Sequence, residues 1–288
     1  MLLSTVSALA LLTVPAAAPG EEPTVVAEVV ITGVIDPDNP PSVRLAREAA
    51  QETPGAVAVV AREAWEDHMA VHLGEALHAV PGVYAQRRWG EDVRLSIRGS
   101  GIGNSVHNRG VVLAQDGVPF NQADGFGDFQ EIDLMSARYI EVFKGGNALR
   151  YGGATMGGAI ELNTPTGHSA PDDNLLRLEG GSFGTFRAHG ELARDWGGWD
   201  LWVGATYLTA DGWREHSGQA SQRLSLNLGR ALGADGELRL IVSAADIQND
   251  IPGALTLSQA LTDPQQAGPG VVARDYRRDM SSLRAALQ

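Results

Sequence analysis

Ile140-Glu141-Val142-Phe143-Lys144-Gly145 is one of several short apolar runs that end at glycine or proline between residues 76 and 167. Runs of four to six residues that stop in this way predict short strands joined by tight turns. The related pieces are Ala76-Leu77-His78-Ala79-Val80-Pro81-Gly82-Val83, Arg94-Leu95-Ser96-Ile97-Arg98-Gly99, Gln115-Asp116-Gly117-Val118-Pro119, Leu149-Arg150-Tyr151-Gly152 and Gly157-Gly158-Ala159-Ile160.

One helix is predicted just before these strands, over residues 68–80. Leu73, Leu77 and Val80 follow one another at intervals of four and three residues, which places them on one helical face. This helix and the short strands together predict an α/β domain.

The pattern changes after Pro171, where apolar and polar residues alternate in segments of about ten residues. Such alternation indicates long strands with one apolar face. It suits a transmembrane β-barrel and a soluble β-sandwich equally well, so both interpretations stay open on this evidence alone. The alternating positions are Leu176 and Leu178, Phe186 to Leu192, Leu201 to Tyr207, Leu224 to Leu228, and Leu238 to Val242.

The order and spacing of these pieces, over residues 24–260, resemble the TonB-dependent outer-membrane receptors, in particular the ferric citrate and siderophore receptor branch. The resemblance implies an α/β plug domain over residues 46–167 and the start of an antiparallel transmembrane β-barrel over residues 174–288. Barrels of this kind have about 22 strands. Only about five fit here, so we expect the chain to be a fragment of a longer protein.

Residues 1–18 are apolar and end in Ala16-Ala17-Ala18, which predicts a secretory signal peptide. An N-terminal extension over residues 19–45 follows, and its β-branched run resembles a TonB box. Such a run would add as a strand to a sheet of the periplasmic partner TonB. An ordinary edge strand of the plug is the alternative. The TonB-box residues are Val25, Val26, Val29, Val30 and Ile31.

Composition excludes several functions. The formal net charge is −13, which argues against nucleic acid as a partner, and the chain has no cysteine for disulfides or thiolate metal sites. The stretch from Gly99 to Asn104 lacks the third glycine of a dinucleotide loop. No serine-nucleophile or zinc-helix motif is present, so we expect neither an enzyme nor a cofactor.

The resemblance places the ligand site on two loops of the plug, Gly99 to Arg109 and Phe120 to Gln130. Ferric citrate and many siderophore complexes are anionic and rich in oxygen, and arginine binds such groups through charge-assisted hydrogen bonds. An ion pair to the barrel wall is the alternative role for Arg98. The predicted ligand-binding residues are Arg98, Asn104, His107, Arg109, Asn121, Gln122, Asp124 and Phe126.

A second interpretation of the Phe120 to Gln130 region rests on its carboxylates. Asp124, Asp128, Glu131 and Asp133 could form a calcium loop, although they lack the alternating spacing of an EF-hand.

The resemblance predicts a receptor in the Gram-negative outer membrane, with outer-membrane lipid, TonB and a ferric chelate as partners. Other cargoes (copper, nickel, cobalamin or a glycan) and a soluble periplasmic binding module are the alternatives.

Overall fold

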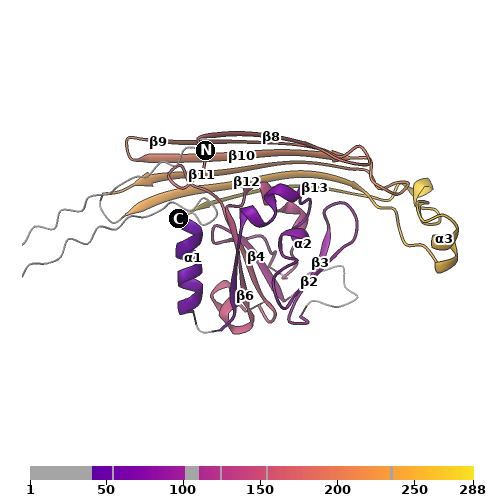
Figure 1. Ribbon diagram of the computed structural model, residues 1–288, viewed down its shortest axis with the longest axis horizontal. Coiled ribbons are helices and arrows are strands. Elements are labelled where there is room, and N and C mark those ends of the chain that lie inside the picture. The colour runs from indigo at the N-terminus through magenta and orange to yellow at the C-terminus, as the bar shows by residue number, and fades with distance from the viewer. Residues whose placement is uncertain (1–40, 54, 101–109, 124, 154, 234–235) are drawn as a thin grey trace, which may run out of the picture. The chain divides into compact units, whose positions relative to one another are not determined.

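The computed structural model describes residues 41–288 except residues 54, 101–109, 124, 154 and 234–235 (Figure 1). The predicted signal peptide and TonB box lie outside the described residues, so both stay predictions. Helix α1 (Pro41–Glu52) is the first described element, and it buries Val43 and Ala46 on one face. The sequence pattern did not predict this helix. Within the described part of the chain, no helix has the length and apolar character that crossing a membrane requires.

A five-stranded sheet forms the centre of the N-terminal domain, by which we mean residues 42–167. Its strand order is β1-β6-β7-β4-β5, with β4 and β7 parallel and the other neighbours antiparallel. Buried apolar side chains such as Leu113, Ile140 and Ile160 form its core. The prediction of short strands is confirmed. The strands are β1 (Val57–Ala61), β4 (Val111–Gln115), β5 (Val118–Pro119), β6 (Tyr139–Lys144) and β7 (Gly158–Asn163).

A separate hairpin of β2 (Val83–Arg87) and β3 (Val93–Ile97) packs onto the same apolar core. Five short 3-10 helices connect the described elements of the N-terminal domain, and several of them carry residues discussed below. They are η1 (Arg62–Ala64), η2 (Glu66–His68), η3 (Phe129–Glu131) and η4 (Leu134–Ser136); a fifth, η5 (Gly145–Tyr151), follows β6.

The predicted helix over residues 68–80 is wrong in length. Only α2 (Leu73–Ala76) is α-helical, because Met69 adopts a left-handed backbone with φ 47° and stops any helix that would start earlier. Leu73, Leu77 and Val80 are nevertheless buried in the core. The apolar spacing therefore identified the buried positions but not the backbone that carries them.

The second half of the chain forms a six-stranded antiparallel sheet, which we call the strand sheet. Each of its strands pairs with the next along the chain (Figure 1). The connection between the last two carries α3 (Leu257–Thr262) and η6 (Val272–Arg274). The strands are β8 (Asn174–Gly180), β9 (Phe186–Trp196), β10 (Trp199–Ala210), β11 (Gln219–Ala231), β12 (Glu237–Asp250) and β13 (Arg277–Leu287).

The sequence predicted about five of these strands and missed β13. Its exposed positions alternate with its half-buried ones, but they include Arg277, Asp279 and Ser281 as well as Leu283. A strand without a consistently apolar face gives no dyad pattern in the sequence, although its backbone still pairs with β12.

Apart from β13, the outer face of the strand sheet is mainly apolar, and most of its charged side chains lie on the inner face together with a few apolar ones such as Trp202 and Ile247. Leu176 is 74% exposed and Leu283 is 75% exposed, whereas Arg187, His189 and Arg223 are buried. A soluble β-sandwich buries its apolar face instead. Of the two interpretations of the alternating segments, this arrangement favours strands whose outer face meets lipid.

Candidate functional site

The polar face of the strand sheet meets the N-terminal domain in a surface lined by charged side chains, which we call the interface. Several of these side chains are completely or almost completely buried. Buried charges are costly unless each has a partner of opposite charge or several hydrogen bonds. The contacts of each group therefore show what holds the two parts together.

Arg223 of β11 makes one of the buried contacts of the interface. Its guanidinium forms an ion pair with Glu91, which lies in the turn between β2 and β3. The same side chain donates to the backbone carbonyl of Gln130, with Nη2 at 2.6 Å and Nε at 3.1 Å. Asn249 of β12 donates to the side-chain oxygen of Gln130 at 2.7 Å. Hairpin β2–β3 and helix η3 are thus both hydrogen-bonded to the strand sheet, through its neighbouring strands β11 and β12.

Glu191 of β9 is the centre of a second buried group. Arg62 of η1 contacts it at 2.6 Å from Nη1 to Oε1, and His189 Nε2 lies 2.8 Å from the same oxygen. Trp202 of β10 donates its indole N–H to Oε2 at 3.1 Å. Here the positive charge comes from the N-terminal domain and the carboxylate from the strand sheet, the reverse of the Glu91–Arg223 pair.

Three of the carboxylates considered for a calcium loop belong to this interface. Asp128 pairs with Arg278 at 2.6 Å and Glu131 pairs with Arg284. Asp133 caps η4 and accepts a hydrogen bond from Thr206 of β10 at 2.6 Å. The described carboxylates are therefore bound by the protein's own side chains, which leaves the calcium interpretation without support. Asp124 lies outside the described residues.

A different set of carboxylates lies within the N-terminal domain. Glu161 of β7 is buried and accepts the backbone N–H of Gly117 at 2.7 Å. Glu141 lies directly opposite it on β6, and Asp116 accepts from both the N–H and the hydroxyl of Thr164. Burial raises the pKa of Glu161 to about 7, and it raises the pKa values of Glu141 and Asp116 as well. Among the described residues, no arginine or lysine forms an ion pair with any of these three carboxylates.

Of the predicted ligand-binding residues, Asn104, His107, Arg109 and Asp124 lie outside the described residues. Arg98 is described. It is exposed, with a left-handed φ of 53°, in the turn after β3. Burial, and then the nearby charge of Arg98, lowers the pKa of Lys144, whose Nζ donates to the carbonyl of Pro81 at 2.7 Å. An exposed arginine beside a second cation is suited to attract an anion.

Asn121, Gln122 and Phe126 come together in one loop, where the N–H of Gln122 donates to the carbonyl of Phe126 at 2.7 Å. The side-chain amide of Asn121 bonds the backbone of Leu113, Val111 and Gly125, so it shapes the loop. Gln122 is exposed and Phe126 is half-buried. Arg98 belongs to a separate turn, and the role of all four in binding a ligand stays a prediction.

Residues 49–159 match the family model of the TonB-dependent receptor plug domain. The N-terminal domain is a TonB-dependent receptor plug. Over 149 residues, half of this chain, the sequence is 28% identical to the vitamin B12 transporter BtuB of Photobacterium profundum. The chain spans only 23% of the length of that relative.

Solved structures show the same fold over plug and strand sheet together. The ferric citrate transporter FecA, in its unliganded form, matches with a TM-score of 0.65 and 21% identity. That match covers 84% of this chain and 38% of FecA. FpvA of P. aeruginosa, bound to an iron–pyoverdine complex, matches with a TM-score of 0.58 and 17% identity, over 82% of this chain and 31% of FpvA. The chain thus has the fold of a plug followed by antiparallel barrel strands, and the six strands do not close a barrel.

The sequence analysis did not single out the interface arginines. Arg223 and Arg284, like Arg62 of η1, have no motif around them. The only signal in the strands was that polar residues occupy the face opposite to the alternating leucines. That pattern shows which side chains point inward, but not the carboxylates that they meet.

Proposed function

We propose that this protein is a TonB-dependent receptor of the Gram-negative outer membrane that imports a ferric chelate, ferric citrate or another siderophore, into the periplasm. The observation that carries the proposal is a plug held by buried, hydrogen-bonded charges against strands whose outer face is apolar. A polar interface can exchange its contacts for water, so the plug can shift without exposing its apolar core. No bond in the cargo is broken, so the proposed activity is transport and not an enzymatic reaction.

The cargo is argued from the chemistry of the plug loops. Ferric citrate is anionic, and Arg98 is an exposed cation beside Lys144. The neighbouring loop offers an exposed amide at Gln122, and Asn104, His107, Arg109 and Asp124 remain candidate ligands. The names of the relatives support an iron chelate in two cases and vitamin B12 in the third. A cobalamin is therefore the second candidate cargo, because one relative matched in sequence is a vitamin B12 transporter.

Coupling to the inner membrane is assigned to the segment with Val25, Val26, Val29, Val30 and Ile31. In the proposed mechanism this segment pairs as a strand with a sheet of TonB, and proton-motive force acts on the plug through it. Backbone hydrogen bonds dominate such pairing, so a proline in the segment weakens it by removing one N–H donor.

Uptake into cells that lack their own iron-chelate receptors tests both assignments. The gene product is expressed, its presence in the outer-membrane fraction is checked, and uptake of radiolabelled ferric citrate, iron–pyoverdine and vitamin B12 is measured. We expect uptake of an iron chelate, its loss in Val29→Pro, and its retention in Val29→Ile, which keeps the backbone donor.

The possible contrary results are distinct. Uptake of vitamin B12 alone would show that the protein is a receptor whose cargo is a cobalamin and not an iron chelate. Full uptake by Val29→Pro would reject this TonB box. Recovery of the protein in the soluble periplasmic fraction would favour a binding module instead of a receptor.

A further inference from the structure

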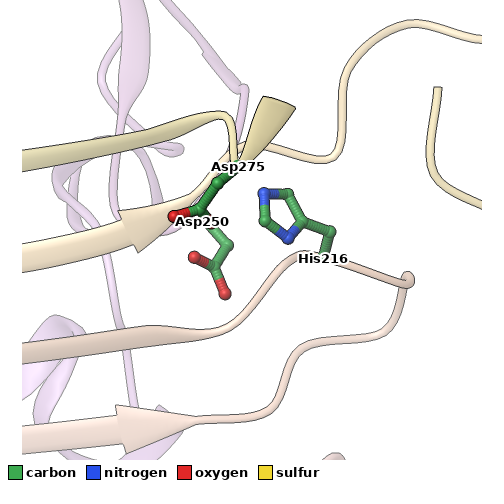
Figure 2. Close-up of side chains that lie close together, drawn as sticks. All are labelled: His216, Asp250 and Asp275. Atoms are coloured by element: carbon green, nitrogen blue, oxygen red, sulfur yellow. The ribbon is translucent and has the colours of Figure 1, made fainter. Parts of the chain in front are cut away.

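His216, Asp250 and Asp275 lie together at one end of the strand sheet (Figure 2). His216 is in the connection between β10 and β11, Asp250 is the last residue of β12, and Asp275 lies shortly before β13. One ligand-capable atom from each side chain lies within 4.8 Å of the other two. Three residues far apart in sequence thus bring one imidazole and two carboxylates together.

The two connections that carry these residues are firmly attached to each other. Arg214 donates to three backbone carbonyls of the β12–β13 connection, at 2.8 to 3.2 Å. Glu215 bonds the same connection through its backbone N–H, at 2.7 Å, and through its carboxylate, at 3.0 Å. His216 is the next residue, so its position is fixed before any ligand binds. The partners of Arg214 and Glu215 are Pro252, Gly253, Gln265, Gln266 and Ala267.

The imidazole of His216 has the hydrogen bond that a metal ligand needs. Nε2 lies 2.9 Å from the carbonyl oxygen of Tyr276 and can only donate to it. In the neutral ring the proton therefore belongs on Nε2 and the lone pair on Nδ1. Histidines that bind metals usually donate their other N–H to a carbonyl or carboxylate in this way.

The two carboxylates share one arginine. Arg277 lies 2.9 Å from Asp275 and 3.8 Å from Asp250, and its side chain is about half exposed. One guanidinium offsets only one of the two negative charges, and an exposed arginine can turn toward water at little cost. An adjoining cavity of about 460 Å³, lined by Asp250, His216 and other polar side chains, gives a cation access to this cluster.

We propose that His216, Asp250 and Asp275 bind a divalent transition-metal ion. One nitrogen and two carboxylate oxygens suit Zn²⁺, which commonly takes three protein ligands and leaves a fourth position for water. An imidazole favours zinc, nickel or copper over calcium and magnesium, which prefer oxygen ligands alone. The bound ion would join the β10–β11 connection to the β12–β13 connection, whatever cargo the receptor imports.

Zinc titration by calorimetry tests the site on the gene product, purified in detergent and stripped of metal with a chelator. We expect one zinc site, weakened at least about tenfold by His216→Asn and by Asp275→Asn. Asparagine suits both positions because it tolerates the left-handed φ of 56° and 48° found there. Arg277→Ala is expected to tighten zinc binding several-fold because it removes the competing cation.

The matched control is His168→Ala. His168 is also exposed beside two carboxylates, Asp195 at 2.8 Å and Asp200 at 3.7 Å, but it lies outside this cluster. Its loss should leave the affinity for zinc unchanged. Zinc binding that His216→Asn does not weaken, or calcium binding tighter than zinc binding, would overturn the proposal. The absorption spectrum of bound Co²⁺ is a second readout, since a spectrum unaffected by His216→Asn would exclude the imidazole as a ligand.

Discussion

Two sets of carboxylates in this molecule have opposite surroundings. At the interface, Glu91 pairs with Arg223 and Glu191 pairs with Arg62 across the boundary between plug and strand sheet. Within the plug, Glu161 lies opposite Glu141 on the next strand, and no described arginine or lysine pairs with either. At the interface an opposite charge lies beside each carboxylate, whereas within the plug burial raises the pKa of Glu161 and Glu141 and so favours the protonated form.

This difference separates two sources of stability. Interface pairs join two parts of the chain and depend on both partners being present. The carboxylates inside the plug make its stability depend on the proton concentration instead. Substitutions at each place should therefore give distinguishable results.

The largest effect is expected from Glu91→Ala. This change leaves the buried guanidinium of Arg223 without its carboxylate, and breaking such a pair typically costs about 3–5 kcal/mol. The free energy of unfolding in urea, followed by tryptophan fluorescence, measures it. Glu48→Ala on the exposed face of α1 is the control, with an expected change within about 0.5 kcal/mol. Equal effects of the two variants would show that burial of the pair contributes nothing.

An intermediate effect is expected from Glu161→Gln, and its sign depends on pH. The pKa of Glu161 is raised by burial from 4.5 to about 7 in the folded protein. The stability that this group contributes is therefore fully present below about pH 4.5 and is lost as the pH rises through about 7. Glutamine keeps the acceptor for Gly117 without the charge. The variant should match the wild type near pH 4.5 and be more stable by up to about 3 kcal/mol at pH 8.

Urea unfolding of both proteins between pH 4.5 and pH 8 checks this prediction. Glu52→Gln, at an exposed position of α1, serves as control and should show no such divergence. A difference between Glu161→Gln and wild type that stays constant with pH would contradict the assigned titration.

Much of the fold was predictable from sequence because short apolar runs and dyad alternation are local signals. Ile140 and Ile160 are buried where the pattern placed them. The same reasoning gave too long a helix after residue 68, since nothing in the apolar spacing reveals the left-handed backbone of Met69. It missed β13, whose outward positions mix leucine with arginine, aspartate and serine.

The interface was less predictable for a different reason. Arg223 and Glu91 are 132 residues apart, and the sequence around each one does not distinguish it from an ordinary surface charge. Only the tertiary structure brings them together. The same holds for His216, Asp250 and Asp275, whose spacing in sequence matches no metal-binding motif. A resemblance to a family indicated a plug followed by barrel strands, but it could not identify contacts that depend on individual side chains.

The smallest change in stability is expected from the double variant Glu91→Leu with Arg223→Met. Replacing both members of a buried pair by apolar side chains of similar size is often neutral, so the free energy of unfolding should stay within about 2 kcal/mol of wild type. Recovery of stability relative to Glu91→Ala would show that the single variant suffers from an unpaired charge. A double variant as unstable as Glu91→Ala would mean that packing and the contacts to Gln130 matter more than the charges.

Uptake of the iron chelate by the same double variant tests whether the polar contacts of the interface are needed for the plug to move. An apolar contact cannot exchange its partners for water, so a plug held by leucine and methionine should resist displacement even though it is no less stable. We therefore expect near-native stability with slower uptake of the iron chelate, measured in the cell assay described above. Wild-type uptake by a stable double variant would instead show that the plug moves without opening the contact between Glu91 and Arg223.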